Sequence, residues 1–277
     1  SSEVVGREDF CKEGYQAQLK SIVIVKNQKV LPQRDRKKVY IPKRHIEPRK
    51  GFFCNDIPAQ DLDPVSTDLV NKYYDRVNSP QDADFAIIFI ESPLSRGYSK
   101  PDRDNGGNGY VPISLQYRPY TANEAREKSI AGGDFREDFD NRSYKGKTGT
   151  TANENDLDLI LDAKKALGNK PVIVVLRMHN PTVPAEFEKS ADAIIVDFGV
   201  QSQALFDIIN GTAEPSGLLP VQMPANMETV EHHCEDLPLD IQPYKDSVGN
   251  EYDFGFGLNW SGPIKDGRAD RYPKPNK

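Results

Sequence analysis

The sequence predicts an α/β fold: a mostly parallel β-sheet sandwiched between helices in a three-layer αβα arrangement, with long loop insertions. Three apolar runs, at 84–90, 171–176 and 193–196, are typical of strands buried on both faces. Helical patterns follow the last two runs, at 184–190 and 202–210. Strands that alternate with helices at this spacing predict βαβ units and right-handed crossovers.

The first part of the chain fits the same pattern. We predict a helix over 7–20, a strand over 21–25 and a second strand over 38–42, which Pro42 ends. A helix is predicted over 66–77, with Ser66 or Thr67 as its cap.

Two further helices are predicted in the middle of the chain. One covers 122–131, and the other, over 155–167, has a clear apolar face and ends at Gly168. The polar residues 132–151 between them form the second long insertion.

Composition excludes several classes of protein. The 277 residues are 37% hydrophobic and 28% charged, as in ordinary soluble proteins, and the net charge of −6 gives no sign of nucleic-acid binding. The sequence has no apolar run long enough to span a membrane. Cys11, Cys54 and Cys234 lack metal-type spacing, and their odd number leaves at least one unpaired within the chain.

A carboxylate and a long loop follow the strand at 84–90. Glu91 lies where open α/β sheets build their sites, just past the carboxyl end of a strand. The loop over 92–121 is too long for a simple connection, and it contains four tyrosines, which argue against disorder. We expect a structured loop that contacts a ligand or another domain.

Four sequence blocks resemble the C-terminal α/β sandwich domain of family 3 glycoside hydrolases. Residues 213–224, AEPSGLLPVQMP, resemble the family's PSGRLPVTFP stretch. Residues 19–27, LKSIVIVKN, followed by Leu31-Pro32, resemble the KSIVLLKN…LP that opens the domain. Residues 190–196, SADAIIV, and 252–258, YDFGFGL, are similar to the ADAIL strand and to the closing YPFGYGLSY signature.

This resemblance implies a β-glycosidase that acts with retention on β-linked glucosides or xylosides. The family places its nucleophilic Asp on an N-terminal (β/α)8 barrel, which is absent from this chain. We therefore expect 1–262 to be the α/β sandwich domain, 263–277 to be a tail or the start of a further segment, and the barrel to be its partner. A retaining mechanism needs two carboxyl groups roughly 5 Å apart, so the isolated chain is predicted to be inactive.

The resemblance leaves the general acid/base open. Many relatives carry it in a Trp-Glu-Ser-Glu-Gly-Tyr-Asp-Arg motif, but the similar stretch here has Leu94 and Arg96 in place of both glutamates. Glu91, three residues before Leu94, is the nearest substitute, and Asp102 or Asp104 is the alternative. A proton donor needs its pKa raised by burial or a nearby charge. Glu91 could instead be a salt-bridged carboxylate, paired with Arg96.

Several other residues are candidates for substrate binding. Tyr98, Tyr110 and Trp260 could stack on sugar rings or pack against the barrel, and His179 follows the strand at 171–176. Arg96 and Asp102 complete the predicted substrate-binding set.

We expect no metal and no cofactor. The acidic turn at 102–108 lacks the closing glutamate of a calcium loop, where Ile113 stands, and it reads as an Asp/Gly turn. His232 and His233, followed by Cys234, point in opposite directions on an extended chain, and they read as a solvated loop.

Two other functions compete with the glycosidase domain. A non-catalytic scaffold or carbohydrate-binding domain would explain the missing glutamates. A self-sufficient α/β enzyme lacks support, because the sequence has no nucleophile elbow and no P-loop.

The sequence predicts the oligomeric state and the location of the protein less precisely. An apolar surface made for the barrel would favour homodimers of an isolated chain. The family resemblance implies a periplasmic or secreted protein, and a chain that begins Ser1-Ser2 is expected to be a processed or excised segment.

Overall fold

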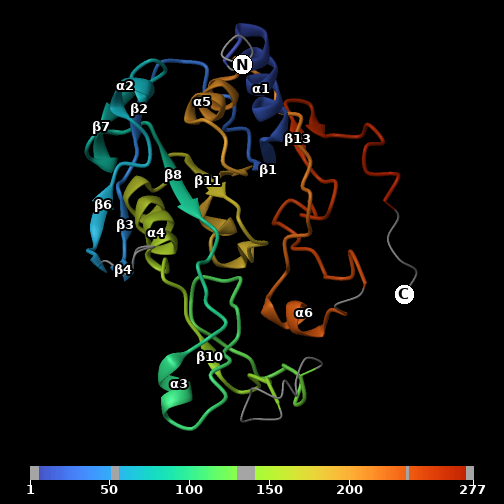
Figure 1. Ribbon diagram of the computed structural model, residues 1–277. Helices are drawn as coiled ribbons and strands as arrows, with labels where there is room; N and C mark the ends of the chain where they lie inside the picture. Colours follow the sequence, from blue (N-terminus) through green and yellow to red (C-terminus); the bar gives the residue numbers. More distant parts are fainter. Residues whose placement is uncertain (1–5, 51–55, 130–140, 235–236, 273–277) are drawn as a thin grey trace.

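The structure is a computed structural model that describes residues 6–50, 56–129, 141–234 and 237–272 (Figure 1). An eight-stranded sheet runs through the centre in the order β14-β13-β1-β12-β11-β8-β2-β7. The strands from β12 to β7 are parallel to one another, whereas β1, β13 and β14 pair antiparallel. Their bounds are β1 Val23–Asn27, β2 Lys38–Tyr40, β7 Asp75–Val77, β8 Phe85–Glu91, β11 Val172–Arg177, β12 Ala193–Asp197, β13 Leu258–Asn259 and β14 Gly262–Pro263.

Helices cover both faces of the sheet (Figure 1), which confirms the predicted three-layer arrangement. Alternate residues of the strands divide the core in two. Ile87 and Ile173 pack with Leu205 on one face, whereas Ile88 and Val174 pack on the other face with α4. The first face carries α1 (Glu8–Ser21), α2 (Thr67–Val70) and α5 (Ser202–Asn210), and the second carries α4 (Asn155–Leu167) with the 3-10 turns η2 (Pro184–Glu186) and η3 (Glu188–Ser190).

The predicted helix over 66–77 is wrong beyond its first turn. Ser66 does cap it by accepting a hydrogen bond from the Leu69 amide, but α2 ends at Val70. Tyr74 then turns into the core, where its hydroxyl donates to the Gln33 carbonyl oxygen at 2.8 Å. The following residues form β7 beside β2, with the 3-10 turn η1 (Pro80–Asp82) after it. Tertiary pairing has overridden local helical spacing.

Two other local predictions differ from the structure. The predicted helix over 122–131 is absent from 122–129, which form turns, and residues 130 and 131 lie outside the described part. The predicted loop at His232 is instead the end of helix α6 (Met227–His232), which Asn226 caps through the Thr229 amide. Helix α3 (Lys100–Asp104) occupies the acidic turn.

The long insertion after β8 folds back on itself through β9 (Tyr120–Thr121) and β10 (Thr148–Gly149), which pair antiparallel. It extends below the sheet in the view of Figure 1, beyond the carboxyl end of β8. A second excursion, between β2 and α2, forms a ribbon beside α4 (Figure 1). In this ribbon β3 (Arg44–Ile46) pairs with β6 (Gln60–Leu62), and β4 (Arg49–Lys50) pairs with β5 (Asp56–Ile57).

Two glycines explain why the PSG and FGFGL motifs occur together. A Cβ at Gly217 would lie 2.3 Å from the Ile22 carbonyl oxygen, and a Cβ at Gly257 would lie 2.2 Å from the Gly217 carbonyl oxygen. The two segments also exchange hydrogen bonds through Leu219, whose amide donates to the Phe256 carbonyl at 2.8 Å. Both motifs therefore join the end of the domain to the entry of β1.

Cys11 and Cys234 are free and exposed, and Cys54 lies outside the described residues. Among the described helices, none has the length and apolar character needed to cross a membrane.

Candidate functional site

Three charged residues stand in one row at the carboxyl edge of the sheet. The register pairs Arg177, the last residue of β11, with Glu91 on β8 and with Asp197 on β12. Because these strands are parallel, all three side chains start at the same edge, where α/β folds build their sites. The Arg177 Nε lies 3.4 Å from Asp197 Oδ1, and the buried Asp197 also accepts hydrogen bonds from the amides of Gly199 and Val200.

A small pocket of about 120 Å³ opens beside this row, on the α5 side. Phe89 and Leu205 give it apolar walls, and Arg44 joins the charged row from the ribbon. Its volume is well below the roughly 300–1,000 Å³ of ordinary small-molecule sites. The pocket is therefore too small to enclose a ligand of ordinary size.

The Glu91 carboxylate is paired with Arg44, not with Arg96 as the alternative interpretation of the sequence supposed. Arg44 Nη1 donates to Glu91 Oε1 at 3.0 Å, and Nε and Nη2 donate to both oxygens of Asp156. Burial alone would lower the pKa of Arg44, but its hydrogen bonds and charge interactions with Asp156 and Glu91 raise that pKa overall. The Glu91 side chain remains 29% exposed.

The backbone at Glu91 is fixed from two sides. The buried Tyr117 hydroxyl donates to the Glu91 carbonyl oxygen at 2.7 Å, and Asn153 Nδ2 donates to the same oxygen at 3.2 Å. The Asn153 Oδ1 atom accepts from the Leu94 amide, where the insertion leaves the sheet. These contacts hold the beginning of the insertion against the first turn of α4.

His179 lies at the same edge but turns outward. Its amide donates to the buried Ser92 Oγ at 3.1 Å, whereas the residue itself is exposed. Thr182 also donates to Ser92 Oγ, at 3.1 Å. Ser92 therefore ties the loop after β11 to the loop after β8.

The insertion carries the remaining predicted residues on a braced framework. Asp102 accepts from Lys147 Nζ at 2.7 Å and from the Gly109 amide at 2.8 Å. The hydrogen bond from Lys147 holds the pKa of Asp102 below its usual value; burial opposes this, and the hydrogen bond from Gly109 supports it. Asp102 is thus a structural brace between two arms of the insertion.

Tyr98 and Tyr110 meet edge to face on this framework, with ring centroids 6.5 Å apart. Tyr98 is exposed, and it lies against Gly109, whose positive φ of 82° and close contact leave no room for a side chain. Arg96 and Tyr98 line a shallow hollow between α3 and the strand β10. Trp260 is partly buried against the core, which favours packing over sugar stacking.

The structure thus places the predicted residues in two groups. Glu91 and His179 lie at the edge of the sheet, whereas Arg96, Tyr98, Asp102 and Tyr110 lie on the insertion.

Sequence reasoning missed four charged residues around Glu91. Arg177 and Asp197 carry a signal that was available, since each is the first charged residue at the end of a buried strand. Arg44 and Asp156 carry none, because the ribbon and α4 meet at Glu91 only in three dimensions.

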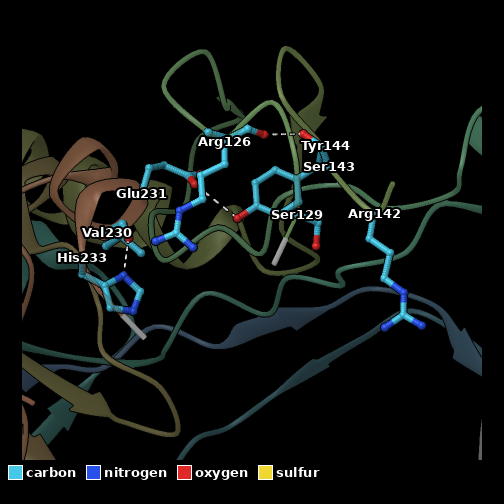
Figure 2. Close-up of a pocket in the computed structure, with 9 residues that line it drawn as sticks. Arg126, Ser129, Arg142, Ser143, Tyr144, Val230, Glu231 and His233 are labelled. Carbon is cyan, nitrogen blue, oxygen red and sulfur yellow. Dashed lines mark hydrogen bonds between the residues drawn. The ribbon is translucent and has the colours of Figure 1, made fainter. Parts of the chain in front are cut away.

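A different hollow lies between the insertion and α6 (Figure 2). Tyr144 donates to Glu231 at 3.2 Å, and Ser143 donates to the Arg126 carbonyl oxygen. Burial raises the pKa of Glu231, and hydrogen bonds from Tyr144 and Tyr120 oppose the rise. These contacts fasten the insertion to α6, so we assign this hollow a structural role.

Comparison with known proteins gives one consistent family. The family model described as "Glycosyl hydrolase family 3 C-terminal domain" matches residues 22–260. The chain is 25% identical over 263 residues to "Probable beta-glucosidase C" from Aspergillus flavus, covering 95% of this chain and 31% of that protein. It is 22% identical over 258 residues to "Periplasmic beta-glucosidase/beta-xylosidase" from Dickeya chrysanthemi, covering 93% of this chain and 30% of that protein.

Solved structures agree on the fold. A β-glucosidase from Listeria innocua, in complex with isofagomine, superposes with a TM-score of 0.51 at 15% identity, over 92% of this chain and 34% of that chain. A β-glucosidase from Chaetomella raphigera gives 0.52 at 18% identity, over 91% of this chain and 36% of that chain. The chain therefore spans about a third of the length of the relatives it matches, and it belongs to the family of glycosyl hydrolase family 3 C-terminal domains.

Proposed function

We propose that this chain is the C-terminal domain, over 1–262, of a retaining β-glycosidase that acts on β-linked glucosides or xylosides. In this proposal 263–277 form a tail or the start of a further segment. The nucleophile comes from an N-terminal (β/α)8 barrel of the same protein, and this chain shapes the substrate site and supplies Glu91 as the general acid/base. No cofactor is required, because both catalytic groups are carboxyls.

The observation that carries the proposal is the position of Glu91 in an incomplete pocket. Glu91 ends a buried parallel strand beside a hollow of about 120 Å³, too small to enclose a sugar. A second domain covering this edge would complete the site. The relatives' names, and their roughly threefold greater length, support that arrangement.

The insertion contributes the sugar contacts in this proposal. Tyr98 and Tyr110 offer aromatic faces, Arg96 is exposed for hydrogen bonding, and Asp102 braces them. His179, exposed at the edge of the sheet, completes the set.

A non-catalytic scaffold or carbohydrate-binding role is the second candidate. The Glu91–Arg44 ion pair at 3.0 Å favours it, since an ion-paired carboxylate is also what a purely structural site would contain. Leu94 and Arg96, in place of the family's glutamates, favour it as well.

The test compares hydrolysis of aryl β-glucosides and β-xylosides by the isolated chain, by the longer polypeptide that includes a barrel, and by its Glu91→Gln variant. We expect activity only in the longer form. Glu91→Gln should slow turnover of poor leaving groups far more than of good ones, and azide should restore turnover because it attacks without a general base. Glu251→Gln, at an exposed carboxylate paired with Lys245, is the matched control.

Each outcome decides between the roles. If Glu91→Gln leaves the activity of the longer polypeptide unchanged, Glu91 is not the general acid/base, and the scaffold role remains. Turnover by the isolated chain would overturn the split site itself.

A further inference from the structure

Arg44 joins three separate elements at the site. It lies at the start of β3 in the ribbon, and its guanidinium contacts Asp156 in the first turn of α4 and Glu91 at the end of β8. The two bonds to Asp156, of 3.0 and 2.8 Å, form a bidentate pair, which fixes the plane of the guanidinium. The third bond, from Nη1, then has a fixed direction toward Glu91 Oε1.

Asp156 holds Glu91 in two ways. Its side chain is 1% exposed, and Oδ2 accepts from the Glu91 amide at 3.1 Å and from Asn153 Nδ2 at 3.0 Å. The same carboxylate therefore anchors the backbone of Glu91 directly and its side chain through Arg44. A group held at two points loses little further freedom when a substrate binds, which is the purpose of a preorganised site.

The arrangement also selects one carboxyl oxygen. Among the described residues, Arg44 is the hydrogen-bond partner of the Glu91 carboxylate, and the bond is made on Oε1. Oε2 has none of these contacts, while the side chain remains 29% exposed and lines the pocket beside Phe89.

We infer that Arg44 is a positioning residue for Glu91, with Asp156 as its buried anchor, and that Oε2 is the oxygen presented to the substrate. This inference rests on the proposed function. Arg44 touches no reacting atom. It sets where Glu91 stands, and it couples the ribbon to the edge of the sheet.

The experiment measures kcat and KM in the longer polypeptide that includes a barrel. Arg44→Met removes all three hydrogen bonds while keeping most of the side-chain volume. We expect kcat to fall about 10- to 100-fold, because a misplaced catalytic group slows the reaction step. KM should change less than about 3-fold, because the lost interaction is expressed in the transition state.

Arg76→Met is the matched control. Arg76 is as buried as Arg44, at 9% against 11% exposed, and it likewise pairs with a carboxylate, Asp63. Arg76 belongs to β7, and its hydrogen bonds go to the Ile41 carbonyl oxygen and to Thr67 instead of to Glu91. Both variants should lower the melting temperature, but only Arg44→Met should lower kcat. Equal losses of kcat in the two variants would mean a merely structural role.

A double-mutant cycle separates this inference from the proposed function. If Arg44 acts through Glu91, Arg44→Met should cost no further activity in a Glu91→Gln background. Arg44→Met with unchanged kcat, beside a damaging Glu91→Gln, would overturn the inference and leave the proposed function standing. A neutral Glu91→Gln would overturn the catalytic role of Glu91 and the inference with it.

Arg44→Lys keeps the test decisive if Arg44→Met fails to fold. An ammonium group can neutralise Asp156, but it lacks the planar fork that reaches both carboxylates. We expect near-normal stability with kcat lowered about 3- to 30-fold. Full activity in this folded variant would overturn the inference.

Discussion

Glu186 illustrates how one side chain fixes the insertion near the site. Its carboxylate accepts hydrogen bonds from two consecutive amides, those of Tyr117 and Arg118, the second at 3.0 Å. Arg118 in turn reaches Glu154 and Asp158 around the first turn of α4. The insertion is thus held where Tyr117 contacts the backbone of Glu91.

A pH dependence follows from the environment of Glu186. Burial raises the pKa of Glu186, and the hydrogen bonds from Arg118 and Tyr117 only partly oppose it. A carboxyl whose pKa is higher in the folded than in the unfolded state contributes stability that is present at low pH and is lost as pH rises through the folded-state pKa.

Glu186→Gln cannot ionise, and it keeps one amide oxygen as acceptor. We therefore expect Glu186→Gln to be more stable relative to the wild type at about pH 7 than at about pH 4, which means a larger difference in unfolding free energy, variant minus wild type, at the higher pH. Urea unfolding at both pH values measures this difference. A relative stability that falls as pH rises would contradict the prediction.

At the scale of elements, a side chain added at either Gly217 or Gly257 should destabilise the contact between the two glycine motifs and the start of β1. Gly217→Ala places its methyl against the Ile22 carbonyl, and Gly257→Ala places it against the Gly217 carbonyl, at 2.3 and 2.2 Å. Because both neighbours are backbone atoms, the main chain itself must move. We expect each variant to lose about 2 kcal/mol or more of unfolding free energy in urea titrations.

Gly14→Ala provides a control of opposite sign. Gly14 lies within α1 and is exposed, and no atom of the described residues outside this helix lies within 4 Å of the position that a Cβ would take. Helix propensity alone then predicts a gain of about 0.5–1 kcal/mol. A gain in all three variants would show that the glycine contacts do not constrain the fold.

The elements that could be predicted from the sequence are those with a strong local pattern. The strand β11 and the helix α4 were predicted almost to the residue, because continuous apolar runs and a clear apolar face leave few alternatives. The segment 66–77 was mistaken because Leu69, Val70 and Tyr73 are spaced as in a helix, whereas the helix ends at Val70 and the ring of Tyr74 packs in the core, 5.1 Å from the ring of Phe85.

The candidate site divides in the same way. Glu91 is a candidate because of its place at the end of a strand, and Tyr98 and Tyr110 are candidates because of their aromatic rings in one long loop. Arg44 could not be found, since nothing near it in the sequence indicates that a ribbon brings it back to Asp156. Contacts between segments far apart in sequence decide such residues, and a single sequence does not encode them in any local pattern.

At the scale of the whole molecule, large apolar side chains are exposed at the carboxyl edge of the sheet and on the insertion. Ile113 is 57% exposed, and Leu94 and Phe198 are exposed as well. If the barrel covers this surface in the longer protein, an isolated chain should associate through it.

We expect the isolated chain to show concentration-dependent association in sedimentation velocity, and Ile113→Ser to weaken it without lowering the melting temperature. Val248→Ser is the control, because Val248 is similarly exposed, at 63%, but does not belong to the carboxyl edge of the sheet. Its neighbour Ser247 contacts Glu188, which comes before the start of β12. An isolated chain that stays monomeric at every concentration, or equal effects of both variants, would contradict the prediction.

The position of β1 has a consequence for biosynthesis. This strand lies between β12 and β13, so Val23 pairs with Val196 and Ile24 with Leu258. Because β1 is translated before both of its partners, it remains apolar and unpaired until residues 193–197 and 258–259 have left the ribosome. Long-range pairing of this kind slows folding, and it leaves hydrophobic surface exposed to aggregation with other nascent chains. Chaperone demand in the cell should thus be set by the interval between translation of β1 and of its two neighbours.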